Sequence, residues 1–494
     1  MVAAAVPEVI QNTVPATGAP QPSVPVDPPE AVTEAVRAAR AAQPAWAALS
    51  FAERRDVLLR FKDELLKALD EVSDLLVEEN GKPRFEALTT EILTVADLTK
   101  FYARRARRLL RDESLPLHLW PHKKSLLRYS PRGVIGVISP WNFPFSIPVG
   151  DVVMSLAAGN AVVLKPSEFT PRIALKARDL FDRAGLPKDL FRVVNGRGST
   201  GAALIQAGVD MVVFTGSVPT GKKIAVACAE KLIPCILELG GKDPAIVLDD
   251  ADLDRAARAI VWGAFANSGQ VCASVERVYV DRKVASGFTE KVVALAKTLK
   301  QGDPTKGAVD VGAMVTPAQI DIVKRHVDDA VASGAKVLVG GAPLPGPGRY
   351  FQPTVLANVD ASMSVMRDET FGPILPIQEV SGEDEAVQLS NDSRYGLTAY
   401  VFGGGARARR VADRLMAGSV LVNDVLFHHG APETPWGGLK ESGLGRVHGL
   451  HGLKDLSVMR HLDFERVHIP KPWYYPYTEK VYGWLRKAFA LVLR

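Results

Sequence analysis

Val134-Ile135-Gly136-Val137-Ile138 is a run of β-branched residues around one glycine, and it marks the point where the chain changes character. Further short, strand-like runs follow it, at residues 161–164, 191–194 and 211–214. Helical patterns lie between these runs, at residues 151–158, 173–184 and 202–206. Strands that alternate with helices predict a parallel sheet with helices on both faces.

A second set of strand-like and helical segments follows the first. The predicted strands are residues 245–247, 278–280, 336–339, 399–402 and 419–423, and the predicted helices are residues 251–268, 285–299 and 317–333. Ahead of Val134, residues 29–111 place apolar residues mainly at helical spacing, after a Pro- and Ala-rich arm or edge strand at residues 1–28. The sequence therefore predicts an α/β protein that is too long for one simple core.

Composition excludes several classes of protein. With 47% hydrophobic and 23% charged residues, the 494-residue chain has the make-up of a globular protein. Its 60 Lys and Arg exceed its 55 Asp and Glu by only five, too few to indicate nucleic-acid binding. Three cysteines argue against a disulfide framework, and no Cys or His cluster has metal-ligand spacing, so we expect no metal. The sequence opens without a signal-peptide pattern and lacks an apolar run of about 18 residues, so a cytoplasmic location is expected.

A cysteine at a glycine turn is the first candidate for chemistry. Residues 267–274 read Asn-Ser-Gly-Gln-Val-Cys-Ala-Ser, with small residues near Cys272 and a strand-like run after it. A cysteine between regular elements is held in place and yet accessible. A free cysteine is more often an inert core residue, so Cys272 needs supporting groups before it counts as a nucleophile.

Polar residues directly follow three of the predicted strands. Asn142 lies among aromatic residues in Pro-Trp-Asn-Phe-Pro-Phe (140–145), where it suits either a capping residue or an oxyanion donor. Lys165 and Glu168 come at the carboxyl edge of the predicted sheet, where nucleotides bind in such folds. Gly216 lets the backbone approach a phosphate and Ser217 can donate to it, although this loop could equally be an ordinary turn.

Glu238 is an unusual carboxylate because it lies within the apolar run Leu237-Glu238-Leu239. An unpaired carboxylate in such a place has a raised pKa, which suits a general base near neutral pH. The alternative is a salt-bridged carboxylate on a strand.

Seven motifs occur in the order seen in the aldehyde dehydrogenase superfamily, which the chain resembles from about Asn12 to about His461. The motifs are residues 140–145, 164–168, 214–221, 237–242, 269–272, 369–373 and 435–438. Residues 268–270, 423–425 and 448–449 are further similar to the class 3 and fatty or coniferyl aldehyde branch. The resemblance implies the aldehyde dehydrogenase fold: a Rossmann-like parallel-sheet cofactor domain, an α/β catalytic domain and a small β oligomerisation element.

The resemblance also implies a mechanism. Cys272 is expected to attack the aldehyde carbon, and the side-chain amide of Asn142 and the N–H of Cys272 to hold the oxyanion. Hydride transfer to the nicotinamide converts the thiohemiacetal into a thioester, and Glu238 activates the water that releases the acid. Because CoA-acylating relatives lack a carboxylate at this position, Glu238 favours hydrolysis over transfer to a thiol.

The family's cofactor residues carry over to fourteen positions, with Lys165 and Glu168 at the adenosine ribose, Ser217 at the pyrophosphate and Glu369 and Phe371 near the nicotinamide. The full set is Pro140, Trp141, Lys165, Ser167, Glu168, Gly198, Phe214, Gly216, Ser217, Gly221, Leu239, Gly240, Glu369 and Phe371. A carboxylate that binds the ribose hydroxyl repels a 2′-phosphate, so Glu168 favours NAD over NADP. The neighbouring Lys165 leaves NADP open as an alternative.

Two departures from the family bear on the substrate. Many members carry a second glutamate where this chain has Val447, so Glu238 would work without that relay. The helix after Asn142 lacks the arginine of succinic semialdehyde enzymes, and its one charged residue, Asp151, is expected to repel such a substrate. We therefore expect uncharged aliphatic or aromatic aldehydes. The alternatives are a succinic semialdehyde or CoA-acylating enzyme, or a catalytically retired structural or membrane-associated member, which the intact Cys272, Glu238 and Asn142 argue against.

The resemblance divides the chain into a cofactor-binding domain (1–112 and 132–240), a catalytic domain (241–440), an oligomerisation element (113–131 and 441–469) and a C-terminal tail (470–494). A homodimer or homotetramer is expected. The tail joins the aromatic cluster Trp-Tyr-Tyr-Pro-Tyr (473–477) to a mixed apolar and basic segment. It suits either packing on the protein or a sister subunit, or peripheral contact with a membrane as an amphipathic helix.

Overall fold

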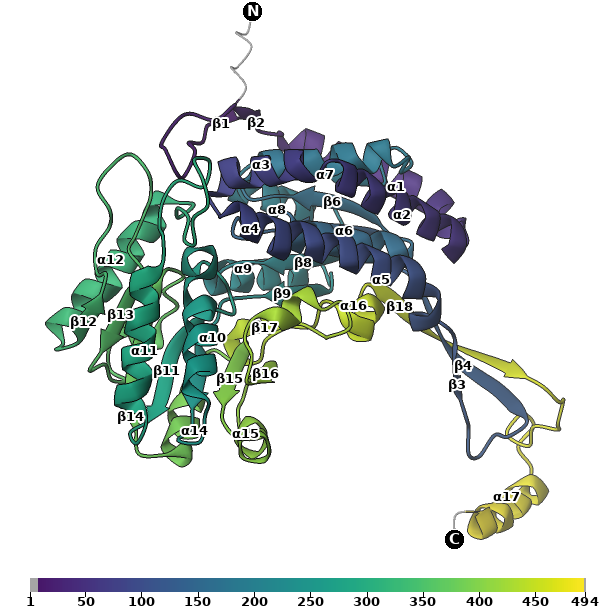
Figure 1. Cartoon of the computed structure of the whole chain (residues 1–494). Helices are drawn as coiled ribbons and strands as arrows, with labels where there is room; N and C mark the ends of the chain where they lie inside the picture. Colours follow the sequence, from purple (N-terminus) through teal and green to yellow (C-terminus); the bar gives the residue numbers. More distant parts are fainter. Residues whose placement is uncertain (1–7, 493–494) are drawn as a thin grey trace, which may run out of the picture. The chain divides into compact units, whose positions relative to one another are not determined.

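The computed structural model describes residues 8–492, so the first seven residues of the predicted arm and the last two of the predicted tail lie outside the description. The chain divides into two compact units. Unit 1 comprises the chain up to Leu110 and Ser130–Val458, and unit 2 comprises Arg111–Tyr129 and the chain from Met459 on. Figure 1 shows that unit 1 holds two large sheets flanked by helices.

The first large sheet has six strands in the order β17-β9-β8-β5-β6-β7. Their bounds are β17 (Gly443–Leu444), β9 (Cys235–Glu238), β8 (Met211–Thr215), β5 (Val134–Ile138), β6 (Ala161–Lys165) and β7 (Phe191–Val193). All neighbours are parallel except β17, which runs antiparallel to β9. The four strands predicted from residue 134 onward are thereby confirmed as one parallel sheet.

Helices cover this sheet and extend ahead of it. They are α1 (Pro29–Ala48), α2 (Phe51–Lys67), α3 (Leu69–Asn80), α4 (Arg84–Glu86), η1 (Ala87–Ile92), α5 (Leu93–Leu109), α6 (Ser146–Ala158), α7 (Pro171–Arg183), α8 (Gly198–Gln206) and α9 (Val218–Glu230). Local sequence sets several of their starts: Ser50 and Glu53 form a reciprocal capping box at α2, and α1 begins with a proline in its first turn. Part of the predicted arm forms a two-stranded sheet, β1 (Val9–Ile10) with β2 (Val24–Pro25).

The second large sheet has seven strands in the order β12-β13-β14-β11-β10-β15-β16. Their bounds are β12 (Lys336–Val339), β13 (Thr354–Ala357), β14 (Ile374–Val380), β11 (Val275–Asp281), β10 (Asp243–Val247), β15 (Thr398–Phe402) and β16 (Ser419–Val422). Only β12 is antiparallel to its neighbour. The strands β13 and β14 were not predicted, and β14 contains Pro376, a residue that argues against a strand because it lacks an N–H group.

Two apolar clusters pack against the second sheet. One contains buried residues of α10 (Leu253–Phe265) and α11 (Ala285–Thr298), and the other contains residues of α12 (Pro317–Ala332), α13 (Ser364–Arg367), α14 (Glu383–Asn391) and α15 (Gly405–Ala412). Short helical turns complete unit 1: η2 (Ala266–Gly269), η3 (Phe427–Gly430), η4 (Lys440–Ser442) and α16 (Gly449–Asp455). Helices on both faces of a mostly parallel sheet are the arrangement predicted from the sequence.

Unit 2 is built on a three-stranded sheet in the order β18-β4-β3, with β18 (Ser457–Glu465), β4 (Lys123–Pro131) and β3 (Glu113–Leu115). Within it, the Ser125 hydroxyl and His461 Nε2 lie 2.6 Å apart. The helix α17 (Glu479–Val492) follows, and Trp120 packs edge-on against Trp473 with ring centroids 5.0 Å apart. No helix in the described range is both long enough and apolar enough to cross a membrane.

Residues 441–469 are one of the two segments of the predicted oligomerisation element (113–131 and 441–469), and they are divided between the two units. Gly443–Leu444 joins the six-stranded sheet, where a side chain on Gly443 would lie 2.2 Å from the Leu237 carbonyl oxygen. Gly449–Asp455 also lies in unit 1, so only the part from Met459 on groups with residues 111–129. The absence of a side chain at Gly443 allows this close pairing of the strands.

Candidate active site

The strand order of the first sheet brings the predicted motifs together. β9, β8, β5 and β6 are adjacent and parallel, so their carboxyl ends meet at one edge of the sheet. Asn142, Lys165, Ser217 and Glu238 lie at or just beyond these ends. Cys272 precedes β11 of the second sheet and lines two cavities, one on each side of it.

The turn ahead of Cys272 has an unusual backbone. Asn267, Ser268 and Gly269 are consecutive left-handed residues, with φ of 50°, 57° and 72°. The carboxylate of Glu86 accepts the Asn267 N–H at 3.0 Å. A side chain on Gly269 would lie 2.2 Å from the carbonyl oxygen of Gly372. Such a strained turn persists only where its surroundings hold it, as they do here.

The Cys272 thiol is held in its neutral form. Burial, followed by the charges of Glu238, Asp243 and Glu369, raises the pKa of Cys272 well above its usual value. A neutral thiol is a weak nucleophile, so this cysteine needs a base or a nearby positive charge when it attacks.

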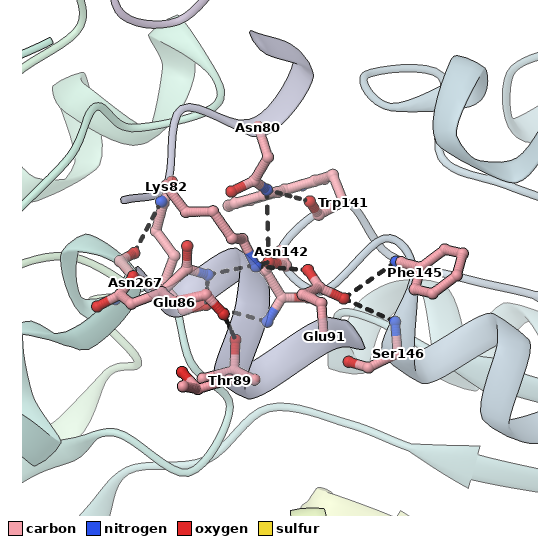
Figure 2. A network of polar contacts seen from close by, with 12 residues as sticks. Asn80, Lys82, Glu86, Thr89, Glu91, Trp141, Asn142, Phe145, Ser146 and Asn267 are labelled. Atoms are coloured by element: carbon pink, nitrogen blue, oxygen red, sulfur yellow. Dashed lines mark hydrogen bonds and ion pairs between the residues drawn. The ribbon is translucent and has the colours of Figure 1, made fainter. Parts of the chain in front are cut away.

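A buried polar network positions Asn142 (Figure 2). The Asn142 carbonyl oxygen accepts hydrogen bonds from Lys82 Nζ at 3.0 Å and Asn267 Nδ2 at 2.9 Å. Its own side-chain amide donates to the Gln270 carbonyl oxygen at 3.0 Å. An amide nitrogen carries two N–H groups, so this bond leaves a second one for another acceptor.

Glu91 completes this network from the next helical segment. It forms an ion pair with Lys82 at 2.5 Å, and both side chains are fully buried. Its other oxygen accepts the N–H groups of Phe145 at 3.2 Å and Ser146 at 2.6 Å, at the start of α6 (Figure 2). Neither Lys82 nor Glu91 was predicted as a site residue, and no local pattern marks either as buried.

Glu238 ends β9 and is 2% exposed. Burial raises its pKa to about 8, although a hydrogen bond from Trp436 and the charge of Arg446 oppose that rise. Its Oε1 atom has no hydrogen-bond partner among residues 8–492. A buried carboxylate with a raised pKa is what a general base near neutral pH requires, so this role of Glu238 stays a prediction.

The expectation that Asp151 repels anionic substrates is wrong in its physical basis. Asp151 is buried within α6, and burial raises its pKa to about 8, so it is largely neutral at pH 7. It is also absent from the lining of both cavities beside Cys272.

The cavity on one side of Cys272 suits a dinucleotide. Its lining includes eight predicted cofactor residues: Pro140, Trp141, Gly216, Ser217, Leu239, Gly240, Glu369 and Phe371. A side chain on Gly240 would lie 2.3 Å from the Glu369 carboxylate, and one on Gly216 would lie 2.5 Å from the Phe214 ring. Ser217 precedes α9, and its side chain caps no N–H of that helix, so the first-turn N–H groups are available to an anion.

The other predicted cofactor residues lie outside this cavity. Lys165 and Ser167 are buried at the end of β6, and Lys165 Nζ lies 3.3 Å from Glu168 Oε2. Gly221 faces Leu239, whose side chain would lie 2.5 Å from an added Cβ. Gly198 has open space around it, so nothing in its surroundings requires a glycine there.

A second buried ion pair holds the loop of Glu369 and Phe371. Lys242 Nζ lies 2.6 Å from Glu276 Oε2, and the Glu276 carboxylate accepts the N–H groups of Thr370 and Phe371, each at 2.8 Å. Phe371 is left-handed, with φ of 52°, and packs edge-on against Trp141 at 5.4 Å. Neither Lys242 nor Glu276 was predicted as a site residue.

The cavity on the other side of Cys272 is mostly apolar, with a volume of about 220 Å³. Its aromatic lining consists of Phe143, Trp262, Phe427, His429 and Trp436. No lysine or arginine among the described residues lines it, and burial lowers the pKa of His429 to about 4, so that ring is neutral. The one carboxylate is Glu86, whose pKa burial raises to about 7.

Comparisons with known proteins agree with this geometry. The model of the "Aldehyde dehydrogenase family" matches residues 2–462. A 4,4'-diapolycopene aldehyde oxidase from Methylomonas sp is 42% identical over 93% of this chain and 86% of its own length. A putative succinate-semialdehyde dehydrogenase [NADP(+)] 2 from Mycobacterium tuberculosis is 42% identical over 88% of this chain and 85% of its own.

Solved structures show the same fold. The NAD+ complex of an aldehyde dehydrogenase from Bacillus cereus has a TM-score of 0.89 at 32% identity, covering 93% of each chain. The predicted fold class, reaction class and NAD(P) cofactor are therefore confirmed at this level. The chain belongs to the aldehyde dehydrogenase family.

Proposed function

We propose that the protein oxidises uncharged, apolar aldehydes to carboxylic acids with NAD(P)+, through a thioester formed on Cys272. The observation that carries this proposal is the position of Cys272 between an apolar cavity and a glycine-lined cavity with carboxylates. The first receives the aldehyde and the second receives NAD(P)+, so the reacting carbon and the hydride acceptor meet at the sulfur.

Each residue around Cys272 has its own role in the reaction. Water in the site takes the thiol proton and the sulfur attacks the aldehyde carbon, while the Asn142 amide and the Cys272 N–H stabilise the oxyanion of the thiohemiacetal. Bound NAD(P)+ supplies the acceptor for the hydride that this adduct loses as it becomes a thioester. Glu238 then takes a proton from water, the resulting hydroxide attacks the thioester carbon, and the carbon–sulfur bond breaks to release the acid.

The apolar cavity supports the choice of substrate. Because no cation among the described residues lines it, a carboxylate at the far end of the substrate would be buried without a partner. Glu86, partly ionised at neutral pH, would add repulsion. We expect kcat/KM for hexanal and benzaldehyde to exceed that for succinic semialdehyde; the reverse order would favour the succinic semialdehyde alternative. Acid formation that depends on added CoA would favour the acylating alternative.

Replacement of the nucleophile tests the mechanism. Cys272→Ala should lower NAD(P)-dependent oxidation of hexanal by about 10³-fold or more, because no thioester can form. Cys235→Ala is the matched control, since Cys235 is a partly exposed cysteine outside both cavities. Equal loss in both variants, or undiminished turnover in Cys272→Ala, would contradict the mechanism.

The proposal also assigns a separate role to each of the three larger sheets. The part built on the six-stranded sheet holds the cofactor, and the part built on the seven-stranded sheet presents Cys272. The sheet of unit 2 joins copies of the chain into a homodimer or homotetramer. Its edge strand β18 exposes Met459 and Phe464, and exposed apolar edge strands are usually covered. Light scattering of the full chain tests this, and a monomer would contradict it.

A separate proposal is that the C-terminal tail contacts a membrane. It exposes Tyr475, Tyr477 and Trp484, and it carries Lys480 and Arg486 nearby. Aromatic residues with cations are the composition that binds an anionic membrane surface. Vesicles containing phosphatidylserine should sediment the full chain but not a chain that ends at Ile469. A change in oligomer mass without lipid binding would instead assign the tail to subunit packing.

A further inference from the structure

A second apolar cavity of about 350 Å³ lies beside the aldehyde cavity. The two share three lining residues: Glu86, Trp262 and Ala266. Trp262 is 47% exposed, so its indole contributes to both cavities and is only half covered by other groups. The two cavities therefore adjoin each other at Trp262.

The walls of the second cavity are predominantly hydrocarbon. α10 contributes Val261 and Phe265, α11 contributes Leu295, and the segment after α11 contributes Leu299 and Val311. Besides Glu86, the charged residues Arg258 and Asp310 line it, and both of these are exposed. The lining thus combines a buried apolar wall with charged groups in contact with solvent.

We propose that this second cavity is a subsite for the distal hydrocarbon of long-chain aldehydes, which rests on the proposed function of Cys272. The aldehyde cavity alone, at about 220 Å³, is smaller than the roughly 300–1,000 Å³ typical of sites for drug-sized ligands. It holds the carbonyl end and the first carbons, and the second cavity adds the space that a longer chain needs. Phe85, which is 73% exposed, and Phe427, which is 55% exposed, extend apolar surface beside the two cavities.

The occupant follows from the position of this surface. The second cavity adjoins the aldehyde cavity at three shared lining residues, so it lies where the distal part of a chain too long for the first cavity would extend. Each methylene buried there should raise kcat/KM about fourfold until the cavity is filled. A substrate with a charged distal end would gain nothing from the apolar wall.

A chain-length series tests the subsite. We expect kcat/KM of the wild-type enzyme to rise from hexanal through decanal to tetradecanal, measured at one fixed detergent concentration. Thr298→Trp places an indole in the second cavity from an exposed position on α11 and should lower kcat/KM for tetradecanal at least tenfold. It should change kcat/KM for hexanal less than twofold. Lys297→Trp is the matched control, because Lys297 is the exposed neighbour outside the cavity lining.

A second variant keeps the test decisive if Thr298→Trp fails to fold. Val309→Trp fills the cavity from the loop after α11 and should have the same chain-length-dependent effect. A flat series beyond hexanal, or equal effects of Thr298→Trp and Lys297→Trp, would overturn the subsite while leaving the proposed function intact. Failure to oxidise any aldehyde would overturn the proposed function itself. A changed oligomer mass in Thr298→Trp without a changed series would assign the cavity to subunit contact and overturn the subsite.

Discussion

On each side of Cys272 a buried Lys–Glu ion pair holds part of the backbone, but the two backbone segments differ in structure. On the aldehyde side, Lys82 pairs with Glu91, and that carboxylate accepts two consecutive N–H groups, of Phe145 and Ser146 (Figure 2). On the cofactor side, a buried Lys–Glu pair (242 and 276) likewise accepts two consecutive N–H groups, of residues 370 and 371. In both, a buried ion pair fixes a loop that carries a site residue.

The difference lies in what each glutamate holds. Glu91 supplies the acceptor for N–H groups at the start of α6, which would otherwise be buried without partners. Glu276 instead holds a loop whose Phe371 is left-handed and therefore strained. The aldehyde side is thus fixed to a regular element, whereas the cofactor side has a loop that depends on one carboxylate. We infer that the two sides respond differently when their glutamates are altered.

Glu238 belongs to neither ion pair, and its replacement should have the largest effect. Glu238→Gln should lower steady-state turnover by about 10²–10⁴-fold, because water then attacks the thioester without a base. The first turnover should still release one equivalent of reduced cofactor per Cys272. Rapid-mixing absorbance measurements separate this burst from the steady state. Loss of both phases together would place Glu238 in the attack of the thiol rather than in hydrolysis.

The pH dependence of kcat tests the same role of Glu238 as the general base. A base acts only when deprotonated, and the pKa of Glu238 is raised to about 8. The wild-type kcat should therefore rise about fivefold from pH 7 to pH 8 and level off above pH 9. The rise should be absent from the residual turnover of Glu238→Gln. An unchanged profile in the variant would assign the titration to another group.

The alternation of strands and helices and the order of the motifs were readable from the sequence, and they predicted the fold and the residues around Cys272. The ion pairs were not readable, because Lys and Glu are rarely buried and nothing near Lys82 or Lys242 marks them as exceptions. Their partners come from elsewhere: Lys82 contacts a loop about sixty residues away. Asp151 was predicted to carry a negative charge, but its burial raises its pKa and leaves it largely neutral. The strand β14 was not predicted because it contains Pro376, a residue that argues against a strand inside a sheet.

Paired substitutions test the difference between the two glutamates. Glu91→Gln should lower kcat about 10- to 100-fold with little change in the KM for cofactor, because the Asn142 loop shifts from its working position. Glu276→Gln should mainly raise the KM for cofactor, by about tenfold, because the Phe371 loop relaxes. Steady-state kinetics with each substrate varied in turn separates the two effects.

Both variants remove one partner of a buried ion pair, so stability is the necessary control. Each should lower the melting temperature, since such a loss typically costs about 3–5 kcal/mol. Activities are therefore compared well below the lower of the two melting temperatures. Identical kinetic changes in the two variants would show that the two ion pairs serve stability alone.

The smallest effect is expected at the far end of the cofactor side, where Glu168 lies 3.3 Å from Lys165. If this carboxylate accepts from the ribose hydroxyl, Glu168→Gln should reduce the preference for NAD over NADP by about tenfold, because repulsion of a 2′-phosphate disappears. Initial rates with each cofactor give the ratio, and Glu383→Gln, a glutamate on α14 outside both cavities, is the control. The Cys272 chemistry should not change, so the burst per active site should equal that of the wild type. A wild-type enzyme that already prefers NADP would show that Lys165 outweighs Glu168, and that the cofactor side tolerates the phosphate.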